Sequence, residues 1–159
     1  MGQDTASAPA LRYEPHDEGK AIGAEPQGKR DRQRHTYGAI DLGTNNCRLL
    51  VARPTDQGFT VIDAFSRIVR LGEGLTQSGR LSDAAMDRAV AALAICGDKL
   101  RRRNVSLSRS VATEACRRAA NGREFVERVR LETGIVLDII EPQEEARLAV
   151  LGCHKLLEP

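Results

Sequence analysis

A strand, a tight polar turn and a returning strand are predicted over residues 37–53, and this segment constrains the chain more than any other. Gly43 is expected in the turn because glycine takes left-handed or close-approach backbone conformations cheaply. Thr44, Asn45 and Asn46 follow with hydroxyl, amide and backbone N–H donors. A row of donors in a turn suits phosphate oxygens, although an ordinary hairpin has a similar polar tip. The turn alone therefore leaves two alternatives, a plain hairpin or a phosphate-binding loop.

Asp41 lies where the first strand meets this turn. A carboxylate beside a phosphate-binding loop suits Mg²⁺, a hard cation that prefers oxygen ligands and phosphates. Asp41 is therefore the candidate metal ligand of the segment.

Composition excludes several function classes. The net charge is only +2 and the aromatic fraction 3%, without Trp, so a nucleic-acid partner is not expected. The four cysteines show no Cys-x-x-Cys spacing, which favours buried free thiols in a reducing cytosol over a metal cluster. No apolar run approaches the length of a membrane span, and the N-terminus lacks the apolar core of a signal peptide. We expect a cytoplasmic protein with no membrane partner.

Two regions differ in composition. Residues 1–35 hold three prolines and a charged run over 29–35, with almost no large aliphatic side chains. Such a segment cannot bury enough apolar surface to offset its ordering entropy, so we expect a disordered tail. Residues 36–159 carry the apolar pattern of a folded unit.

Hydrophobic patterns and capping residues predict six further elements in that unit. They are a strand over 59–71, a helix from the N-cap Ser82 to about Arg103, a strand over 105–113, a helix over about 122–133 that Gly134 ends, a buried strand over 135–140, and a helix that starts at Pro142. This order predicts an α/β fold, a mixed sheet whose opening three-stranded meander is antiparallel.

Two later segments carry residues of the same chemical kind as the opening turn. Thr113 and Arg117 leave a strand end, the usual place for ligand groups in such sheets, although a surface arginine is commonly just solvated. Glu144 and Glu145 lie in the first turn of the last predicted helix, where acids also simply complement the helix dipole. Each segment alone leaves a structural and a functional interpretation open.

Four segments in this order resemble the exopolyphosphatase / guanosine pentaphosphate phosphatase family. They are Asp41-Leu42-Gly43-Thr44-Asn45, Arg70-Leu71-Gly72-Glu73-Gly74-Leu75, Ala112-Thr113-Glu114-Ala115-Cys116-Arg117 and Glu144-Glu145-Ala146-Arg147. The resemblance covers residues 37 to about 156. It implies a ribonuclease-H-like domain of the actin/hexokinase/Hsp70 superfold, with residues 36–159 as the N-terminal portion of the first phosphatase domain. It further implies Mg²⁺-assisted release of terminal phosphate from inorganic polyphosphate or pppGpp, a choice the sequence leaves open.

The resemblance also implies roles for particular residues. Asp41 would hold Mg²⁺, and Glu145 matches the catalytic glutamate, a general base or water-orienting residue. The implied phosphate-binding residues are Gly43, Thr44, Asn45, Arg48, Thr113 and Arg117, with Arg67 and Arg70 as further candidates at the cleft edge. Asn46 stands where a serine is commoner in the family.

One family motif is absent from the chain. A second phosphate loop of the form Asp-x-Gly-Gly-Gly-Ser-x-Glu follows the catalytic glutamate in the family, and the sequence stops before it. We therefore expect the domain to be incomplete at the C-terminus and inactive alone, as a fragment, a truncated reading frame or a shortened relative; a homodimer stays open for the full-length form. The alternatives are a non-catalytic polyphosphate- or nucleotide-binding module and a kinase of the same superfold. The Glu-Glu-Ala-Arg helix start, which those kinases lack, argues against the last.

Overall fold

The computed structural model describes residues 35–56 and 58–157, with side chains up to Gly152. The tail predicted for residues 1–35 lies outside the described residues except for His35. No helix in the described part of the chain combines the length and the apolar character that crossing a membrane requires.

A five-stranded mixed sheet forms the centre of the fold, with the strand order β3-β2-β1-β4-β5. The meander consists of β1 (Tyr37–Leu42), β2 (Asn46–Thr55) and β3 (Gly58–Ile68), and its two pairings are antiparallel. The strands β4 (Leu107–Ala112) and β5 (Asp138–Ile139) extend the sheet in parallel with β1. The predicted α/β class with an antiparallel opening meander is confirmed.

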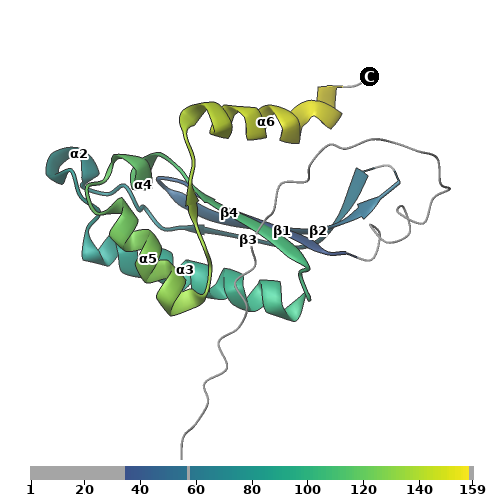
Figure 1. Cartoon of the computed structure of the whole chain (residues 1–159), viewed down its shortest axis with the longest axis horizontal. Helices are drawn as coiled ribbons and strands as arrows, with labels where there is room; N and C mark the ends of the chain where they lie inside the picture. The colour runs from purple at the N-terminus through teal and green to yellow at the C-terminus, as the bar shows by residue number, and fades with distance from the viewer. Residues whose placement is uncertain (1–34, 57, 158–159) are drawn as a thin grey trace, which may run out of the picture.

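Helices lie on both faces of this sheet (Figure 1). The helices α3 (Asp83–Arg102) and α5 (Gly122–Thr133) cover one face, and α6 (Pro142–Leu157) lies over the other. Two short helices, α2 (Leu75–Ser78) and α4 (Glu114–Arg118), lie at one end of the sheet. The sequence pattern did not predict these two, because so short a helix shows no helical periodicity.

The longer helices begin and end where their capping residues predict. The Ser82 hydroxyl accepts a hydrogen bond from the Ala85 amide at 3.3 Å, as an N-cap residue does. Gly134 adopts the left-handed conformation, φ 74°, at the C-terminus of α5, where glycine is the favoured residue. Both cap predictions are confirmed.

The predicted strand over 135–140 is too long. Ile135, Leu137 and Ile140 are buried as their apolar character indicates. Only Asp138 and Ile139 pair, however, with Val111 and Ala112 of β4. Burial in this segment comes from core packing, and the short overlap with β4 limits the ladder to two residues.

The core lies between the sheet and the layer of α3 and α5. Its largest fully buried side chains include Ile40, Leu42, Leu93 and Phe125. The cysteines at positions 47, 96 and 116 are buried free thiols, as the sequence predicts for cysteines in apolar patterns. The face of the sheet under α6 is left to form the candidate site.

Candidate functional site

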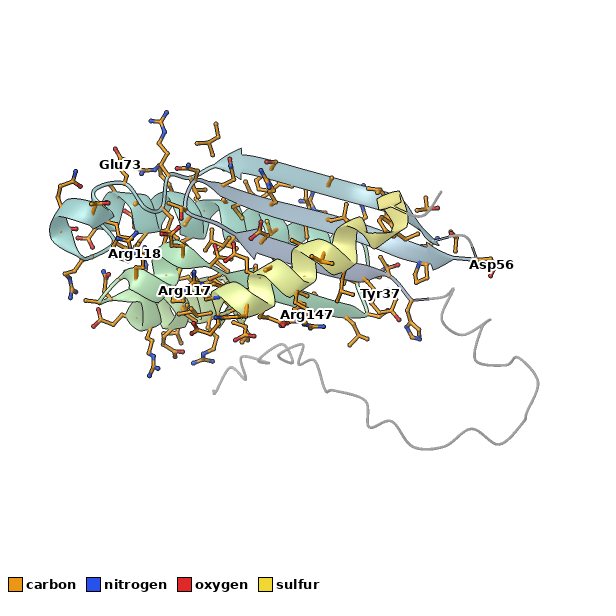
Figure 2. All side chains as sticks on the ribbon, turned by 90° about the horizontal axis from the view of Figure 1, so that it is seen from above. Tyr37, Asp56, Glu73, Arg117, Arg118 and Arg147 are labelled. Carbon is orange, nitrogen blue, oxygen red and sulfur yellow. The ribbon has the colours of Figure 1, made fainter. Side chains whose placement is uncertain are left out.

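The carboxyl ends of the parallel strands bring the predicted site segments to one edge of the sheet. The loop over residues 43–45 follows β1, Thr113 follows β4, and α6 follows β5. The Thr113 amide donates to the Leu42 carbonyl at 3.2 Å, and the Ile140 amide donates to the Ala112 carbonyl at 3.1 Å. Ligands commonly bind at this edge in open α/β sheets. Figure 2 shows Glu73 and Arg117 toward this end of the sheet, with Tyr37 and Asp56 at the opposite end.

Two backbone donors of the 43–45 loop have no protein acceptor within the described residues. The Asn45 carbonyl accepts from the Val69 and Arg70 amides at 2.8 and 3.0 Å, and the Thr44 carbonyl accepts from the Gly72 amide at 3.0 Å. Within the described residues, neither the Thr44 nor the Asn45 amide donates a hydrogen bond to another protein group. The acceptors of the loop are thus turned into the protein while two amides are left for a ligand, which is the arrangement an anion requires.

Of the two reasons expected for Gly43, left-handed backbone or close approach, the left-handed backbone is not observed. Gly43 is not among the glycines with positive φ, and a Cβ placed on it would meet only the Asn46 carbonyl oxygen, at an ordinary 3.7 Å. The Gly43 amide donates to that same oxygen at 2.9 Å, which closes the turn without left-handed backbone. The protein itself therefore has room for a side chain at this position.

An open groove of about 830 Å³ runs between the sheet and α6. Four of the predicted site residues line it: Asp41, Arg48, Thr113 and Glu145. Its polar lining also includes Arg109, and most of the remaining lining is apolar, contributed by the strands and by α6. The structure thus brings together, around one space, residues that are far apart in the sequence.

Asp41 has the surroundings of a residue that can hold Mg²⁺. It lines the groove, is exposed, and its carboxylate makes no hydrogen bond or ion pair within the described part of the chain. Mg²⁺ is commonly held by one or two carboxylates together with water and substrate phosphates. A single available carboxylate beside a row of amide donors fits that mode, so the residues present are compatible with the ion.

Thr113 supplies a hydroxyl to the groove. It is the N-cap residue of α4, yet its side chain makes no capping hydrogen bond. Thr113 is a buried residue that lines the groove. Every fully buried side-chain polar atom in the described residues has a partner, so the unpaired Thr113 hydroxyl must be accessible, and it faces the groove. The hydroxyl is therefore available to a ligand.

Arg117 links the strand end to the first turn of α6. Its Nη1 donates to the Ile140 carbonyl at 2.5 Å and lies 3.8 Å from Glu145 Oε2. Figure 2 shows its side chain beside the first turn of that helix. Arg117 is thus in contact with the predicted acid, although it does not itself line the groove.

The two adjacent acids of α6 have different surroundings. Glu144 accepts two hydrogen bonds from Arg147, at 2.7 and 2.9 Å, and one from Arg109 at 3.1 Å. Arg147, and then Arg109, hold the pKa of Glu144 at about 2. Glu145 has only the 3.8 Å ion pair with Arg117 and lines the groove. The environment therefore fixes Glu144 in an ion-pair cluster and leaves Glu145 facing the groove.

Arg67 and Arg70 do not line the groove. The Arg67 guanidinium lies over the Phe65 ring, 5.4 Å from its centroid, in a cation–π contact, and Phe65 is a groove residue. Arg70 follows β3 in a left-handed conformation, φ 49°, which is uncommon for a residue other than glycine. Both lie beyond the groove.

Two arginines were missed by the sequence reasoning. Arg109 lies on β4, two residues before Val111 and four before Thr113, and all three line the groove, because the alternation of a strand places them on one face. Arg88 of α3 binds the segment after β3, a long-range contact for which the sequence carries no local signal. Alternation could have identified Arg109; nothing in the pattern identifies Arg88.

Comparisons with known proteins converge on one family. The model of the Ppx/GppA phosphatase family matches residues 50–159. The match begins after the 43–45 loop, and the structural matches extend over more of the chain.

Three solved structures illustrate the likeness. A Ppx/GppA family member from Aquifex aeolicus is 34% identical with a TM-score of 0.74, over 79% of this chain and 41% of its own. An exopolyphosphatase-like protein is 32% identical with a TM-score of 0.68, over 72% of this chain and 35% of its own. An exopolyphosphatase from Cytophaga hutchinsonii is 28% identical with a TM-score of 0.68, over 72% of this chain and 36% of its own. The chain spans about two fifths of the length of the Aquifex aeolicus protein.

Proposed function

Because this chain belongs to the Ppx/GppA phosphatase family, we propose that it binds the end of a phosphate chain in the groove and carries the acid that assists hydrolysis of the terminal phosphate. One observation carries the proposal: both carbonyls of the Thr44–Asn45 loop are bound by the protein while both amides are left without a protein acceptor in the described residues. A turn of this kind attracts an anion and offers nothing to a cation.

The proposed site residues divide into binders and a proton acceptor; of the binders, Arg48 and Thr113 line the groove, whereas Thr44 and Asn45 lie in the loop after β1 and do not. The Thr44 and Asn45 amides, the Thr113 hydroxyl and the Arg48 guanidinium donate to phosphate oxygens. Donors fixed before the reaction stabilise charge that builds up on those oxygens as the phosphoanhydride bond breaks. Glu145, on the opposite wall, accepts a proton from the water that attacks the terminal phosphorus and orients that water.

Asp41 is the residue that would hold Mg²⁺. The ion, when bound, would neutralise charge on the phosphate oxygens. Asp41 holds its carboxylate at the groove wall next to the loop, so the ion and the amides would act on the same end of the phosphate chain.

Glu145 is proposed as the acceptor over Glu144 on the basis of their surroundings. Two arginines hold the pKa of Glu144 at about 2, and such a carboxylate is a weak base at neutral pH. Its oxygens also already accept three hydrogen bonds. Within the described residues, the Glu145 carboxylate has only its 3.8 Å ion pair with Arg117, and the residue lines the groove.

The proposed substrate class is a linear phosphoanhydride, either inorganic polyphosphate or a nucleotide with a 5′-triphosphate such as pppGpp. Two of the similar structures are an exopolyphosphatase and an exopolyphosphatase-like protein, which favours polyphosphate as the first compound to test. Inorganic tripolyphosphate carries the chemistry common to both and is the simplest probe.

Hydrolysis is best tested in a chimaera that continues this chain with the remaining length of the Aquifex aeolicus relative. Glu145→Gln keeps the size and much of the hydrogen bonding of the side chain but removes the base. We expect Mg²⁺-dependent phosphate release from polyphosphate to fall by roughly 10²- to 10⁴-fold, the scale of a positioned general base. Thermal stability should be nearly unchanged, because the side chain is exposed.

Glu144→Gln is the matched comparison, one residue away. Normal turnover in Glu145→Gln with a dead Glu144→Gln enzyme would show that the wrong acid was chosen. Binding of tripolyphosphate without any turnover in the chimaera would leave a binding module as the function.

A further inference from the structure

The segment over residues 69–73, hereafter the bracing segment, directly contacts the phosphate-binding loop. Its Val69 and Arg70 amides bind the Asn45 carbonyl, and its Gly72 amide binds the Thr44 carbonyl. These bonds hold the two loop carbonyls toward the bracing segment, while the Thr44 and Asn45 amides have no acceptor in the described residues. The orientation of the loop therefore depends on the shape of the bracing segment.

The two segments are packed so closely that Gly72 is required. A Cβ on Gly72 would lie 2.4 Å from the Thr44 Cγ2 atom, so a side chain there must turn the Thr44 side chain or push the segments apart. The bracing segment is also bent at Arg70, which has φ 49°. A left-handed conformation in a residue other than glycine persists only where its surroundings hold it.

Arg88 of α3 holds the bracing segment in this conformation. Its Nε donates to the Val69 carbonyl at 2.9 Å, and its Nη2 donates to the Arg70 carbonyl at 3.3 Å and to Glu73 Oε2 at 2.6 Å. One planar guanidinium thus joins the residues on both sides of the bend. Lysine could not reproduce this, because its ammonium is a point donor without a fixed fork.

Arg88 itself is not among the residues that line the groove. It reaches the proposed site only through the bracing segment, whose amides then hold the Thr44 and Asn45 carbonyls. The connection runs from a long helix anchored in the core to the loop, with a hydrogen bond at each step.

We propose that Arg88 is a positioning residue, which fixes the bracing segment and through it holds the Thr44 and Asn45 amides in place for phosphate. This inference rests on the proposed function, since it assigns a role in phosphate binding. It explains why the Arg70–Leu75 motif accompanies the loop although Arg70 does not line the groove.

The test uses the intact 159-residue chain and inorganic tripolyphosphate with Mg²⁺, measured by calorimetry. Arg88→Gln should weaken tripolyphosphate affinity by about tenfold, the effect of misaligning a hydrogen bond to a charged group. Arg88→Lys should recover only part of the loss. In the ligand-free protein, Arg88→Gln should shift the Thr44 and Asn45 amide resonances and speed hydrogen exchange of the Val69, Arg70 and Gly72 amides, which donate to the loop carbonyls.

Arg128→Gln is the matched control. Arg128, on α5, makes ion pairs of the same kind, at 2.7 Å with Asp87 and 2.6 Å with Glu132, and does not contact the bracing segment. Its replacement should lower stability slightly and leave affinity unchanged. Should Arg88→Gln fail to fold, Arg88→Lys and Glu73→Gln carry the same comparison.

Equal affinity in wild type and Arg88→Gln, or equal losses in Arg88→Gln and Arg128→Gln, would overturn the inference. Absence of tripolyphosphate binding in the wild type would instead refute the proposed function and with it the role in phosphate binding. The ligand-free amide resonances separate the two failures. If Arg88→Gln leaves the Thr44 and Asn45 resonances unshifted, the role of Arg88 in positioning the loop is refuted.

Discussion

The fold does not require glycine at position 43. The Gly43 backbone is not left-handed, and the protein leaves ordinary space for a Cβ. The proposed phosphate binding would require glycine here, because a ligand would approach the loop backbone closely.

Gly43→Ala should therefore leave the melting temperature nearly unchanged and lower tripolyphosphate affinity by about tenfold or more, because a methyl group would occupy space that a phosphate needs. Calorimetry and thermal unfolding of the same sample measure both quantities. Gly72→Ala is the contrast, because its Cβ would meet the Thr44 methyl group. Gly72→Ala should lower the affinity and also the free energy of unfolding, the latter by about 1–3 kcal/mol, the usual effect of overpacking. Unchanged affinity in Gly43→Ala would mean that phosphate does not approach the loop backbone.

Glu144 and Glu145 are adjacent acids that differ through their tertiary contacts. The motif Glu144-Glu145-Ala146-Arg147 identified the acidic pair, and the family resemblance pointed to Glu145. Only the structure shows why the two differ, because the Arg109–Glu144 contact joins residues 35 positions apart. No local pattern encodes that pairing.

The element that carries the proposed acid, α6, is anchored by charge at its first turn. Glu144 binds Arg109 of β4, and Arg109 also lies 3.9 Å from Asp138 of β5. Arg117 adds its bond to the Ile140 carbonyl just before the helix. These contacts set where Glu145 lies over the groove.

Arg109→Gln should therefore loosen the first turn of α6 without unfolding the domain. The Glu145 amide donates to the Glu141 carbonyl at 3.0 Å; its hydrogen exchange should become faster, while exchange within α3 should not change. Glu144→Gln should give a similar effect, and the double variant should fall short of the sum of the two, because both substitutions remove the shared Arg109–Glu144 bond. Additive effects would show that the two residues act separately.

A second ion-pair cluster joins β3 to α3 and predicts a pH dependence. Lys99, and then Arg103, hydrogen-bond Asp63 at 2.8 and 2.9 Å and lower its pKa from 3.8 to about 2. Because the pKa is lowered on folding, the stabilisation is present above the ordinary value and is lost as pH falls through the folded value.

Asp63→Asn should accordingly be less stable than wild type at neutral pH, and the difference should shrink as pH falls from about 4 to about 2. Thermal unfolding across that range measures it. An undiminished stability difference between wild type and Asp63→Asn at the acidic end of the range would show that the charge of Asp63 is not the source of the stabilisation.

Hydrophobic periodicity predicted the long elements well, because α3, α5 and the first two strands of the meander each bury one consistent face. Hydrophobic periodicity failed where the length of a strand depends on the residues that the neighbouring strand offers for pairing. The apolar run over 135–140 is buried as expected, yet β4 offers only Val111 and Ala112 as partners, so the ladder stops early. The bracing role of Arg88 likewise depends on tertiary contacts.

The whole groove is lined by two acids, Asp41 and Glu145, and the chain spans about two fifths of its Aquifex aeolicus relative. Phosphoryl transfer needs positioning and charge neutralisation from several sides at once. The 159-residue chain should therefore release little phosphate from long-chain polyphosphate with Mg²⁺. Robust release that Glu145→Gln abolishes would show that a complete site forms, for example between two copies.

Exposed apolar side chains on α6 and the apolar groove beneath it predict self-association. Val150 and Leu151 of α6 are 64% and 56% exposed, and the groove beneath the helix is largely apolar. Contiguous exposed apolar surface promotes association. Sedimentation velocity should show concentration-dependent oligomers that Leu151→Lys reduces. Leu131→Lys on α5, which replaces a leucine of 70% exposure on the other side of the sheet, should have less effect. Equal effects of the two substitutions would place the association elsewhere.

Binding of phosphate by the Thr44 and Asn45 amides can be followed in an NMR titration of the labelled chain with tripolyphosphate and Mg²⁺. We expect the largest amide shifts at Thr44 and Asn45, smaller shifts at Thr113 and Glu145, and almost none in α5. Saturable shifts confined to that set would support this binding. Shifts spread over the basic end of α3, or none at the loop at saturating tripolyphosphate, would contradict it.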